Sequence, residues 1–299
     1  MPDADAVLRI DGLVKHYGRV EAVRGLDLEV RTGEVVGFLG PNGAGKTTTL
    51  RCLLGLLRPT AGRITVFGLD VATDGVAARR RMAYVPGELR LPERVTGSEL
   101  VASLGRLRGS LDPARRDALA ERLQLDLGRR VRELSTGNRR KVALLTAFLS
   151  GADLLVLDEP TSGLDPLMQH VFLELVREAR AAGATILLSS HVLSEVQRAA
   201  DRVVVLKSGA VVAAGTVTEL RGRARQRLEI WFAGPAPAAE LLDLPQLGQP
   251  VVDGSHVTAT LTGPIQPLLG VLARHQVATL LVEEPDLEEA FLDLYGSAA

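Results

Sequence analysis

The first two thirds of the chain alternate between short strand-like runs and longer segments in which apolar residues recur every three or four positions. The short runs predict strands, and those at 154–157 and 185–189 are expected to be buried. The runs fall at residues 7–14, 25–30, 34–39, 63–67, 154–157, 185–189 and 203–206. Helical patterns separate them, chiefly at residues 46–57, 95–150 and 167–181. Alternation of strands and helices predicts a parallel sheet with crossover helices, so the expected fold class is α/β.

One stretch of this region is helical without interruption by a predicted strand. Between residues 95 and 150 the pattern stays helical, and the pair Asp112-Pro113 fits an N-cap followed by the first residue of a helix. We therefore predict a helical insertion in the α/β core, spanning about residues 88–150.

The character of the chain changes after Leu220. A basic spacer comes first, made of Arg221, Arg223, Arg225 and Arg227. It is typical of a solvated hinge, and contact with lipid headgroups or a partner is the alternative. Strands at 228–232, near 251, at 257–261 and at 278–282 are then predicted, with helices at 238–242, 265–274 and 287–294. The pattern indicates a first domain over residues 1–220 and a small α+β domain over 226–299.

Composition narrows the class of protein. The formal net charge of the 299 residues is −1, which argues against a nucleic-acid partner. The single cysteine, Cys52, rules out an internal disulfide and fits a reducing compartment. No apolar run approaches the ~20 residues that a membrane-spanning helix needs, and residues 1–5 are acidic, unlike a signal peptide. If the protein serves a membrane, another polypeptide is expected to cross it.

A glycine-rich loop carries the strongest chemical signal. The sequence Gly40-Pro-Asn42-Gly43-Ala-Gly45-Lys46-Thr47 fits the P-loop pattern and lies between a predicted strand and a predicted helix. Glycines allow consecutive backbone N–H groups to cradle phosphate, and the N-terminus of the helix adds its positive dipole. Lys46 can reach the β- and γ-phosphates, and Thr47 can ligate Mg²⁺. Thr48 is also predicted to bind the nucleotide. ATP and Mg²⁺ are therefore the expected cofactors.

Three further side chains follow predicted core strands. Asp158 and Glu159 end the apolar run 154–157, and His191 comes just after the run 185–189. Ligands of open parallel sheets bind beyond the carboxyl ends of the strands, where the P-loop also lies. Asp158 is placed to hold Mg²⁺, Glu159 to polarise the attacking water, and His191 to contact the γ-phosphate. The alternatives are a solvated strand end for the two acids and a hydrogen-bonded structural role for His191.

These motifs, in this order, resemble the ATP-binding cassette (ABC) family over residues 7 to about 220. Residues 40–47 resemble its Walker A motif, 154–159 its Walker B motif, 162–165 its D-loop, and His191 its switch histidine. Leu134-Ser135-Thr136-Gly137-Asn138 resembles its signature motif, and Tyr17 resembles the aromatic residue that stacks on adenine. The resemblance implies a P-loop ABC-type nucleotide-binding domain with an antiparallel β subdomain and a helical insertion.

The signature also has a physical basis of its own. Ser135 is expected to cap a helix over residues 138–149, so that its hydroxyl and the nearby amides form an anion site. In the family this site closes over ATP held by a second subunit. The resemblance therefore implies a homodimer in which Ser135, Gly137 and Asp165 serve the opposite nucleotide.

The sequence departs from the family pattern in two places. Thr136 and Asn138 replace the commoner glycine and glutamine of the signature, although the helix cap is kept. Gly87 stands where the family usually has the glutamine of the Q-loop, and glycine has no side chain with which to touch Mg²⁺ or water. The next residue, Glu88, is predicted to work in coupling to the membrane partner, with a solvated loop acid as the alternative.

The resemblance implies an ATPase that powers a transporter through a separate membrane permease, bound peripherally at the cytoplasmic face of the cell membrane. The C-terminal appendage, which ends in residues 287–294, resembles the extension found on cassettes of bacterial drug and antibiotic exporters. The expected activity is therefore export of a drug, an antibiotic or a lipid-like compound, and the appendage is a candidate dimerisation module. The alternatives are a soluble ABC ATPase that acts on ribosomes or DNA, and a non-catalytic ATP-binding regulator.

Overall fold

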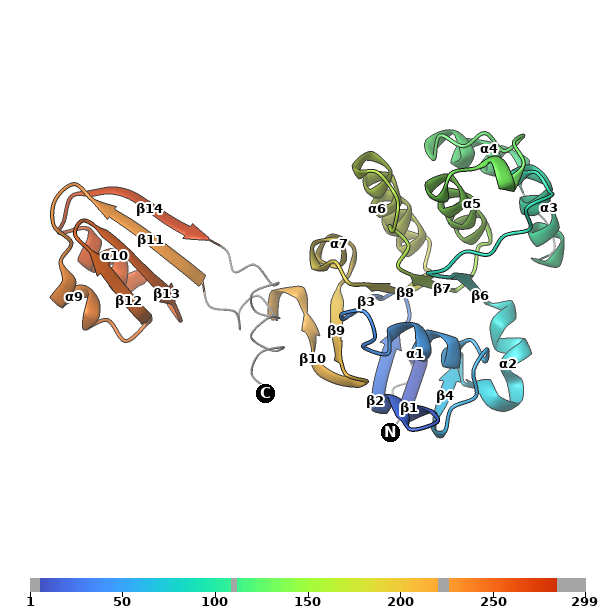
Figure 1. Cartoon of the computed structure of the whole chain (residues 1–299), viewed down its shortest axis with the longest axis horizontal. Coiled ribbons are helices and arrows are strands. Elements are labelled where there is room, and N and C mark those ends of the chain that lie inside the picture. The colour runs from blue at the N-terminus through green and yellow to red at the C-terminus, as the bar shows by residue number, and fades with distance from the viewer. Residues whose placement is uncertain (1–5, 109–111, 220–225, 284–299) are drawn as a thin grey trace. The chain divides into compact units, whose positions relative to one another are not determined.

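The computed structural model describes residues 6–108, 112–219 and 226–283, and the chain divides into two compact units, Met1–Val217 and Thr218–Ala299. Figure 1 labels the elements of both units. Each unit has its own hydrophobic core.

A six-stranded sheet forms the centre of the first unit. Its strand order is β10-β9-β3-β8-β7-β6. The strands are β3 (Val35–Leu39), β6 (Met82–Val85), β7 (Leu154–Asp158), β8 (Thr185–Ser190), β9 (Arg202–Lys207) and β10 (Ala210–Thr216). All pairs are parallel except β9 with β10. Every residue of β3, β7 and β8 is buried, as predicted for β7 and β8, and the α/β class is confirmed.

A second sheet in this unit is antiparallel, with the order β2-β1-β4-β5. Its strands are β1 (Ala6–Tyr17), β2 (Val20–Arg31), β4 (Ala61–Val66) and β5 (Leu69–Asp70). Leu8 and Ile10 of β1 belong to the same buried cluster as Phe38 of β3 and Leu50 of the helix α1 (Lys46–Leu53). Because burial of each such side chain contributes about 1.5–3 kcal/mol, this shared core holds the P-loop between the two sheets.

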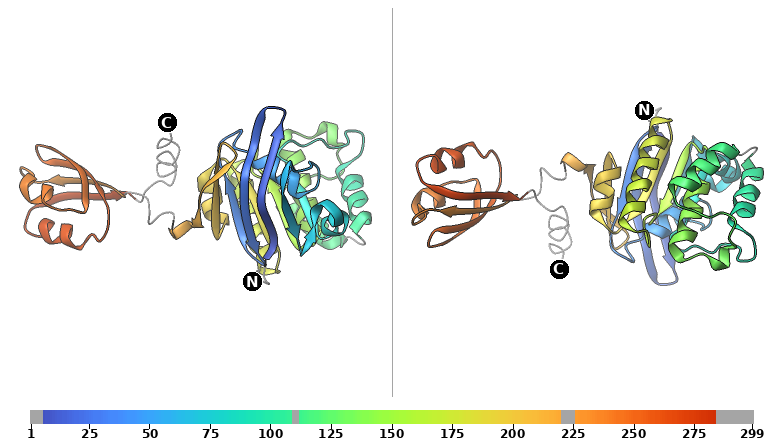
Figure 2. Two further views of the ribbon diagram at one scale, coloured as in Figure 1. Left: turned by 90° about the horizontal axis from the view of Figure 1, so that it is seen from below. Right: turned by 90° about the horizontal axis from the view of Figure 1, so that it is seen from above.

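The predicted helical insertion contains α3 (Gly97–Arg108), α4 (Pro113–Arg122), a 3₁₀ turn (Val131–Glu133) and α5 (Thr136–Leu149). Figure 2 shows these helices gathered beside the sheet. The Asp112 carboxylate accepts a hydrogen bond from the Ala114 N–H at 2.9 Å, with Pro113 in the first turn, which confirms the predicted start of α4. Other helices of the unit are α2 (Val71–Arg80), α6 (Pro166–Ala181) and α7 (Leu193–Ala199).

The predicted end of the first helix was wrong. α1 ends at Leu53 rather than at residue 57. Gly55 has φ 66°, and the N–H of Leu56 returns to the carbonyl of Arg51 at 2.9 Å. A left-handed glycine just past the last turn is a common helix stop, and apolar periodicity alone does not show it.

The second unit is a four-stranded antiparallel sheet with two short helices. Its elements are β11 (Gln226–Phe232), α9 (Ala238–Leu242), β12 (Leu247–Asp253), β13 (His256–Leu261), α10 (Gln266–Leu272) and β14 (Val277–Glu283). The strand order is β12-β13-β11-β14. The predicted α+β character is confirmed for these residues. The helix predicted at 287–294 and the residues Arg221, Arg223 and Arg225 lie outside the described residues.

No helix within the described ranges combines the length and the apolar character required to span a bilayer.

Candidate nucleotide site

The P-loop joins β3 to α1 and requires glycine for two different reasons. Gly43 and Gly45 have φ 83° and 104°, a backbone conformation that other residues rarely adopt. At Gly40 a Cβ atom would lie 2.6 Å from the carbonyl oxygen of Leu206 in β9. The loop is thus packed tightly against its neighbours, and its positive φ angles match the curled backbone that cradles anions.

Lys46 is 5% exposed and lies at the base of this loop. Its ammonium donates to the carbonyl of Gly40 at 2.6 Å and to that of Pro41 at 3.2 Å. Its Nζ is 3.6 Å from Oε1 of Glu159. Burial lowers the pKa of Lys46, and the carboxylates of Glu159 and Asp158 oppose this shift. The loop therefore holds a cation among neutral carbonyls, next to the catalytic candidate Glu159.

Asp158, at the end of β7, is fully buried and receives hydrogen bonds from two neighbouring elements. The hydroxyl of Thr47 in α1 donates to its Oδ2 at 2.9 Å, and the hydroxyl of Ser189 in β8 donates to its Oδ1 at 2.5 Å. A buried carboxylate needs such donors, because leaving it unsatisfied costs several kcal/mol. Asp158 and Thr47 were predicted to hold one metal ion together. They are distant in the sequence, but the fold brings them into contact.

Glu159 has φ 47°, a strained conformation for a residue with a side chain. Its N–H is held by Ser189, through the backbone carbonyl at 3.1 Å and the hydroxyl at 3.1 Å. Strain of this kind costs ~1–3 kcal/mol and is found mainly at functional sites. The turn directs the Glu159 carboxylate toward two nitrogen atoms. Its Oε1 lies 3.3 Å from Nδ1 of His191 and 3.6 Å from Nζ of Lys46.

The donor set at Asp158 fits Mg²⁺. One carboxylate and one hydroxyl are hard oxygen ligands, 2.9 Å apart. In the described part of the chain no three His, Cys, Asp or Glu side chains gather around a common point. Mg²⁺ is usually held by one or two protein oxygens together with phosphate oxygens of the substrate.

Three other residues were predicted to contact the nucleotide. Tyr17 is at the end of β1, 47% exposed, with Nζ of Lys15 5.4 Å from its ring centroid. Asn42 is exposed and Thr48 is half-buried. Their roles at the nucleotide stay predictions.

The signature and the D-loop form one surface. Ser135 caps α5, as predicted, by accepting from the N–H of Asn138 at 3.2 Å. Asp165 caps α6 by accepting from the N–H of Met168 at 3.0 Å. A Cβ on Gly137 would lie 2.8 Å from the carbonyl oxygen of Gly163, so the two motifs are in close contact. Within the described residues no hydrogen bond or ion pair joins Ser135 to the P-loop of the same chain.

Sequence reasoning missed two polar residues of the site. Ser189 holds both Asp158 and Glu159, and its position at the end of a buried strand was the available signal. Arg140, in α5, is 4% exposed and donates to the carbonyls of Pro86 and Gly87. Its spacing from the buried residues Leu144 and Phe148 places it on the buried face of the helix, a signal the pattern also contained.

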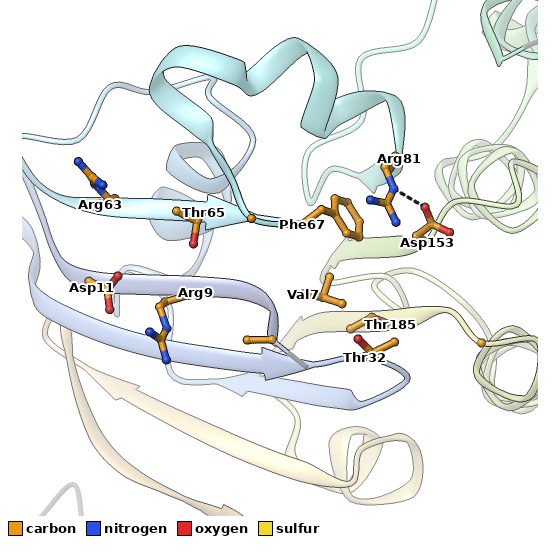
Figure 3. A pocket seen from close by; sticks show the side chains of 13 residues that line it. Val7, Arg9, Asp11, Thr32, Arg63, Thr65, Phe67, Arg81, Asp153 and Thr185 are labelled. Atoms are coloured by element: carbon orange, nitrogen blue, oxygen red, sulfur yellow. Dashed lines mark hydrogen bonds and ion pairs between the residues drawn. The ribbon is translucent and has the colours of Figure 1, made fainter. Parts of the chain in front are cut away.

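The cavity shown in Figure 3 is a different site, of about 700 Å³, between β1, β4, the residue before β7 and the first residue of β8. Asp153 and Thr185 line it, so it lies at the opposite ends of these strands from Asp158 and Glu159. Its three arginines are paired with acids: Arg9 with Glu29 at 2.6 Å, Arg63 with Asp70 at 3.4 Å and Arg81 with Asp153 at 2.7 Å. This balance of charge makes it a poor site for phosphate.

Comparisons with known proteins agree with this geometry. A family model described as ABC transporter matches residues 23–162. The daunorubicin resistance ATP-binding protein DrrA3 of Streptomyces coeruleorubidus is 40% identical over 98% of this chain and 97% of that protein. The Nod factor export ATP-binding protein I of Paraburkholderia xenovorans is 34% identical over 98% of each. A solved structure of the ATP binding subunit of an ABC transporter superposes with TM-score 0.67 at 34% identity, over 72% of this chain and 92% of that one.

Fold and site together define a P-loop ATPase of the cassette type. The chain belongs to the ABC transporter family, in which it is an ATP-binding subunit that hydrolyses ATP.

Ser189 provides a test of this geometry. Ser189→Ala removes the donor to Asp158 and one acceptor for the Glu159 N–H, so the free energy of unfolding should fall by about 1.5–3 kcal/mol and kcat for ATP hydrolysis by about tenfold. Urea denaturation and steady-state hydrolysis measure both effects.

Ser190→Ala is the matched control, because the Ser190 hydroxyl donates to Glu195 at 3.0 Å instead of to Asp158 or Glu159. Its kcat should stay within about twofold of wild type. Equal losses of kcat in the two variants would contradict the role given to Ser189.

Proposed function

We propose that this chain powers the export of a drug, an antibiotic or a lipid-like compound through a separate membrane permease, as a homodimer bound to the cytoplasmic face of the membrane. The observation that carries the proposal is similarity over both units. The drug-resistance and Nod-factor-export relatives align with 98% of the chain, which includes the second unit as well as the cassette.

The clustered residues support the following division of work on ATP. Amides of Gly40, Asn42, Gly43 and Gly45 cradle the phosphates, together with Lys46, Thr47 and Thr48. Thr47 and Asp158 hold Mg²⁺, which neutralises charge on the phosphate oxygens. Glu159 accepts a hydrogen bond from the attacking water and polarises it. His191, whose ring nitrogen lies 3.3 Å from Glu159, orients that carboxylate and contacts the γ-phosphate. Tyr17 stacks on adenine.

The proposal of two copies is supported by the signature surface, where among the described residues no hydrogen bond or ion pair joins Ser135 to the P-loop. The start of α5 presents Ser135 exposed and Gly137 half-buried, next to the D-loop with Asp165. We infer that this surface covers the nucleotide on the P-loop of a second copy. Both faces are present in one chain, so a homodimer has two complete sites.

An apolar groove supplies the surface for the permease. It has a volume of about 350 Å³ and lies between β6, the loop after it, α3 and α5. Its apolar lining includes Leu89, Leu91, Leu100, Val101, Leu104 and Val142. Leu104, which lines the groove, is 37% exposed, and contiguous apolar surface of this kind is typical of protein–protein contacts. We infer that an apolar loop of the permease occupies this groove.

Glu88 lies between Gly87, which approaches Asp158, and Leu89, which lines the groove. Its Oε1 accepts from Nη2 of Arg90 at 3.2 Å, and both side chains are well exposed, so this pair contributes at most about 1 kcal/mol. Because the pair is weak, Glu88 can exchange Arg90 for a basic residue of the permease. The role of Glu88 in coupling stays a prediction.

The catalytic proposal is tested by Glu159→Gln. The amide cannot accept the proton of the attacking water, so hydrolysis should fall by about 10²-fold or more while ATP affinity is kept. With ATP and Mg²⁺ the variant should elute as a stable dimer in size-exclusion chromatography. Turnover near the wild-type rate would remove Glu159 from this role, and would leave the choice between another base and a purely electrostatic site.

The export proposal is tested by Leu104→Asp in cells that hold the chain together with its permease. A charge in the apolar groove should abolish the gain in ATPase rate that the permease gives and lower efflux of an anthracycline at least about tenfold, since burying an unpaired carboxylate is prohibitive. Basal hydrolysis by the isolated chain should stay within about twofold of wild type.

Val76→Asp, at a residue of α2 that is 65% exposed and does not line the groove, is the matched control and should leave efflux unchanged. If wild type, Leu104→Asp and Val76→Asp export equally, the groove does not dock the permease. If none of them exports the compound while ATP is hydrolysed, the proposed cargo is wrong.

A further inference from the structure

Arg140 is a buried cation that connects two parts of the first unit. It lies in α5, five residues after Ser135, and is 4% exposed. Its Nη1 donates to the carbonyl of Pro86 at 2.6 Å and its Nη2 to the carbonyl of Gly87 at 2.5 Å. One guanidinium thus holds two consecutive peptide carbonyls of the loop after β6, a geometry that its planar fork favours.

The loop that Arg140 holds lies against the metal-binding carboxylate. A Cβ on Gly87 would be 3.2 Å from Oδ2 of Asp158, the same oxygen that accepts from Thr47. One arginine side chain and one peptide unit connect the signature helix α5 to Asp158. A shift of α5 would therefore move the Gly87 backbone relative to Asp158.

The charges around Arg140 agree with this placement. Burial lowers the pKa of its guanidinium, and the charges of Asp158 and Glu159 oppose that shift. Burial of the Tyr84 side chain in β6, together with the charge of Asp158, raises the pKa of Tyr84 to about 12. The Nε–H of Arg140 is buried and has no hydrogen-bond partner among the described residues. Burying the Arg140 guanidinium with one N–H unsatisfied costs desolvation free energy, so apolar packing alone does not explain this residue.

We propose that Arg140 is a positioning residue that ties the signature helix to the metal-binding edge of the site, by holding the Pro86–Gly87 backbone against Asp158. The inference rests on the proposed function, because Ser135, which caps the start of α5, lies at the surface assigned to the second copy. When a second copy binds that surface and shifts α5, Arg140 moves the Gly87 backbone relative to Asp158.

Amide hydrogen exchange on the full-length, nucleotide-free chain tests the connection without any reaction. In Arg140→Met, peptides covering residues 82–92 should exchange at least about fivefold faster, since the loop loses both of its donors, while peptides covering 36–50 keep the wild-type rate. Arg139→Met is the matched control. It removes a neighbouring arginine that also donates to two carbonyls, those of Val131 and Arg132, within the helical region itself.

Kinetics then separate positioning from general damage. Arg140→Met should lower kcat about tenfold while KM for ATP and the affinity for ATP without Mg²⁺ stay within about twofold, because the P-loop is intact. Arg140→Lys keeps the charge and the stem but cannot hold both carbonyls, so it should lose kcat to a similar extent. Should Arg140→Met not fold, Arg140→Lys carries both measurements.

Unchanged exchange at 82–92, or full kcat in Arg140→Lys, would overturn the proposal. So would a parallel loss of kcat and metal-free ATP affinity, which denotes damage to the whole site. The exchange measurement stands even if the wild-type chain exports nothing, so failure of the proposed function is recognised separately.

Discussion

The carboxylate of Asp158 is the point on which the rest of the site depends. It is fully buried at the end of β7, and the Thr47 hydroxyl of α1 and the Ser189 hydroxyl of β8 satisfy it from two sides. Ser189 also fixes the N–H of Glu159 in its strained turn. One buried charge thereby sets the register between the P-loop, the β7 edge and the β8 edge, because an unsatisfied carboxylate in this core would cost several kcal/mol.

The same constraint explains how distant motifs act together. Gly87 approaches Asp158 from the loop after β6, and Arg140 holds that loop from α5. The helical insertion is therefore joined to the catalytic edge through polar contacts as well as through apolar packing. The second unit has its own core, and its relation to transport is supported by relatives that align along its length.

Much of the fold could be predicted because it follows local rules. The all-apolar runs became the buried strands β3, β7 and β8, and the caps at Asp112 and Ser135 are where the sequence placed them. A helical stretch without stated bounds was expected between the last two core strands, where α7 lies. The strand β10 was not predicted, because its residues are half-buried or exposed and form no buried apolar run. The end of α1 was misplaced because a glycine in the left-handed region decides it.

The site was predictable where chemistry is concentrated in a motif, as in residues 40–47 and 158–159. Ser189 and Arg140 were missed because their partners are 31 and 53–54 residues away in sequence, and only the fold brings them together. The spacing of Arg140 from Leu144 and Phe148 marks the buried face of α5, but it does not identify the carbonyls that the arginine holds.

The central claim is that two copies of this chain complete each other's nucleotide sites. The most direct measurement mixes a Ser135→Arg chain with a Lys46→Ala chain in equimolar amounts and follows ATP hydrolysis. Alone, each variant places one lesion in both composite sites and should be inactive. In the mixed dimer both lesions fall in one site and the other is whole, so hydrolysis should return. A mixture as inactive as the separate variants, or a Ser135→Arg chain that hydrolyses ATP at the wild-type rate by itself, would contradict the account.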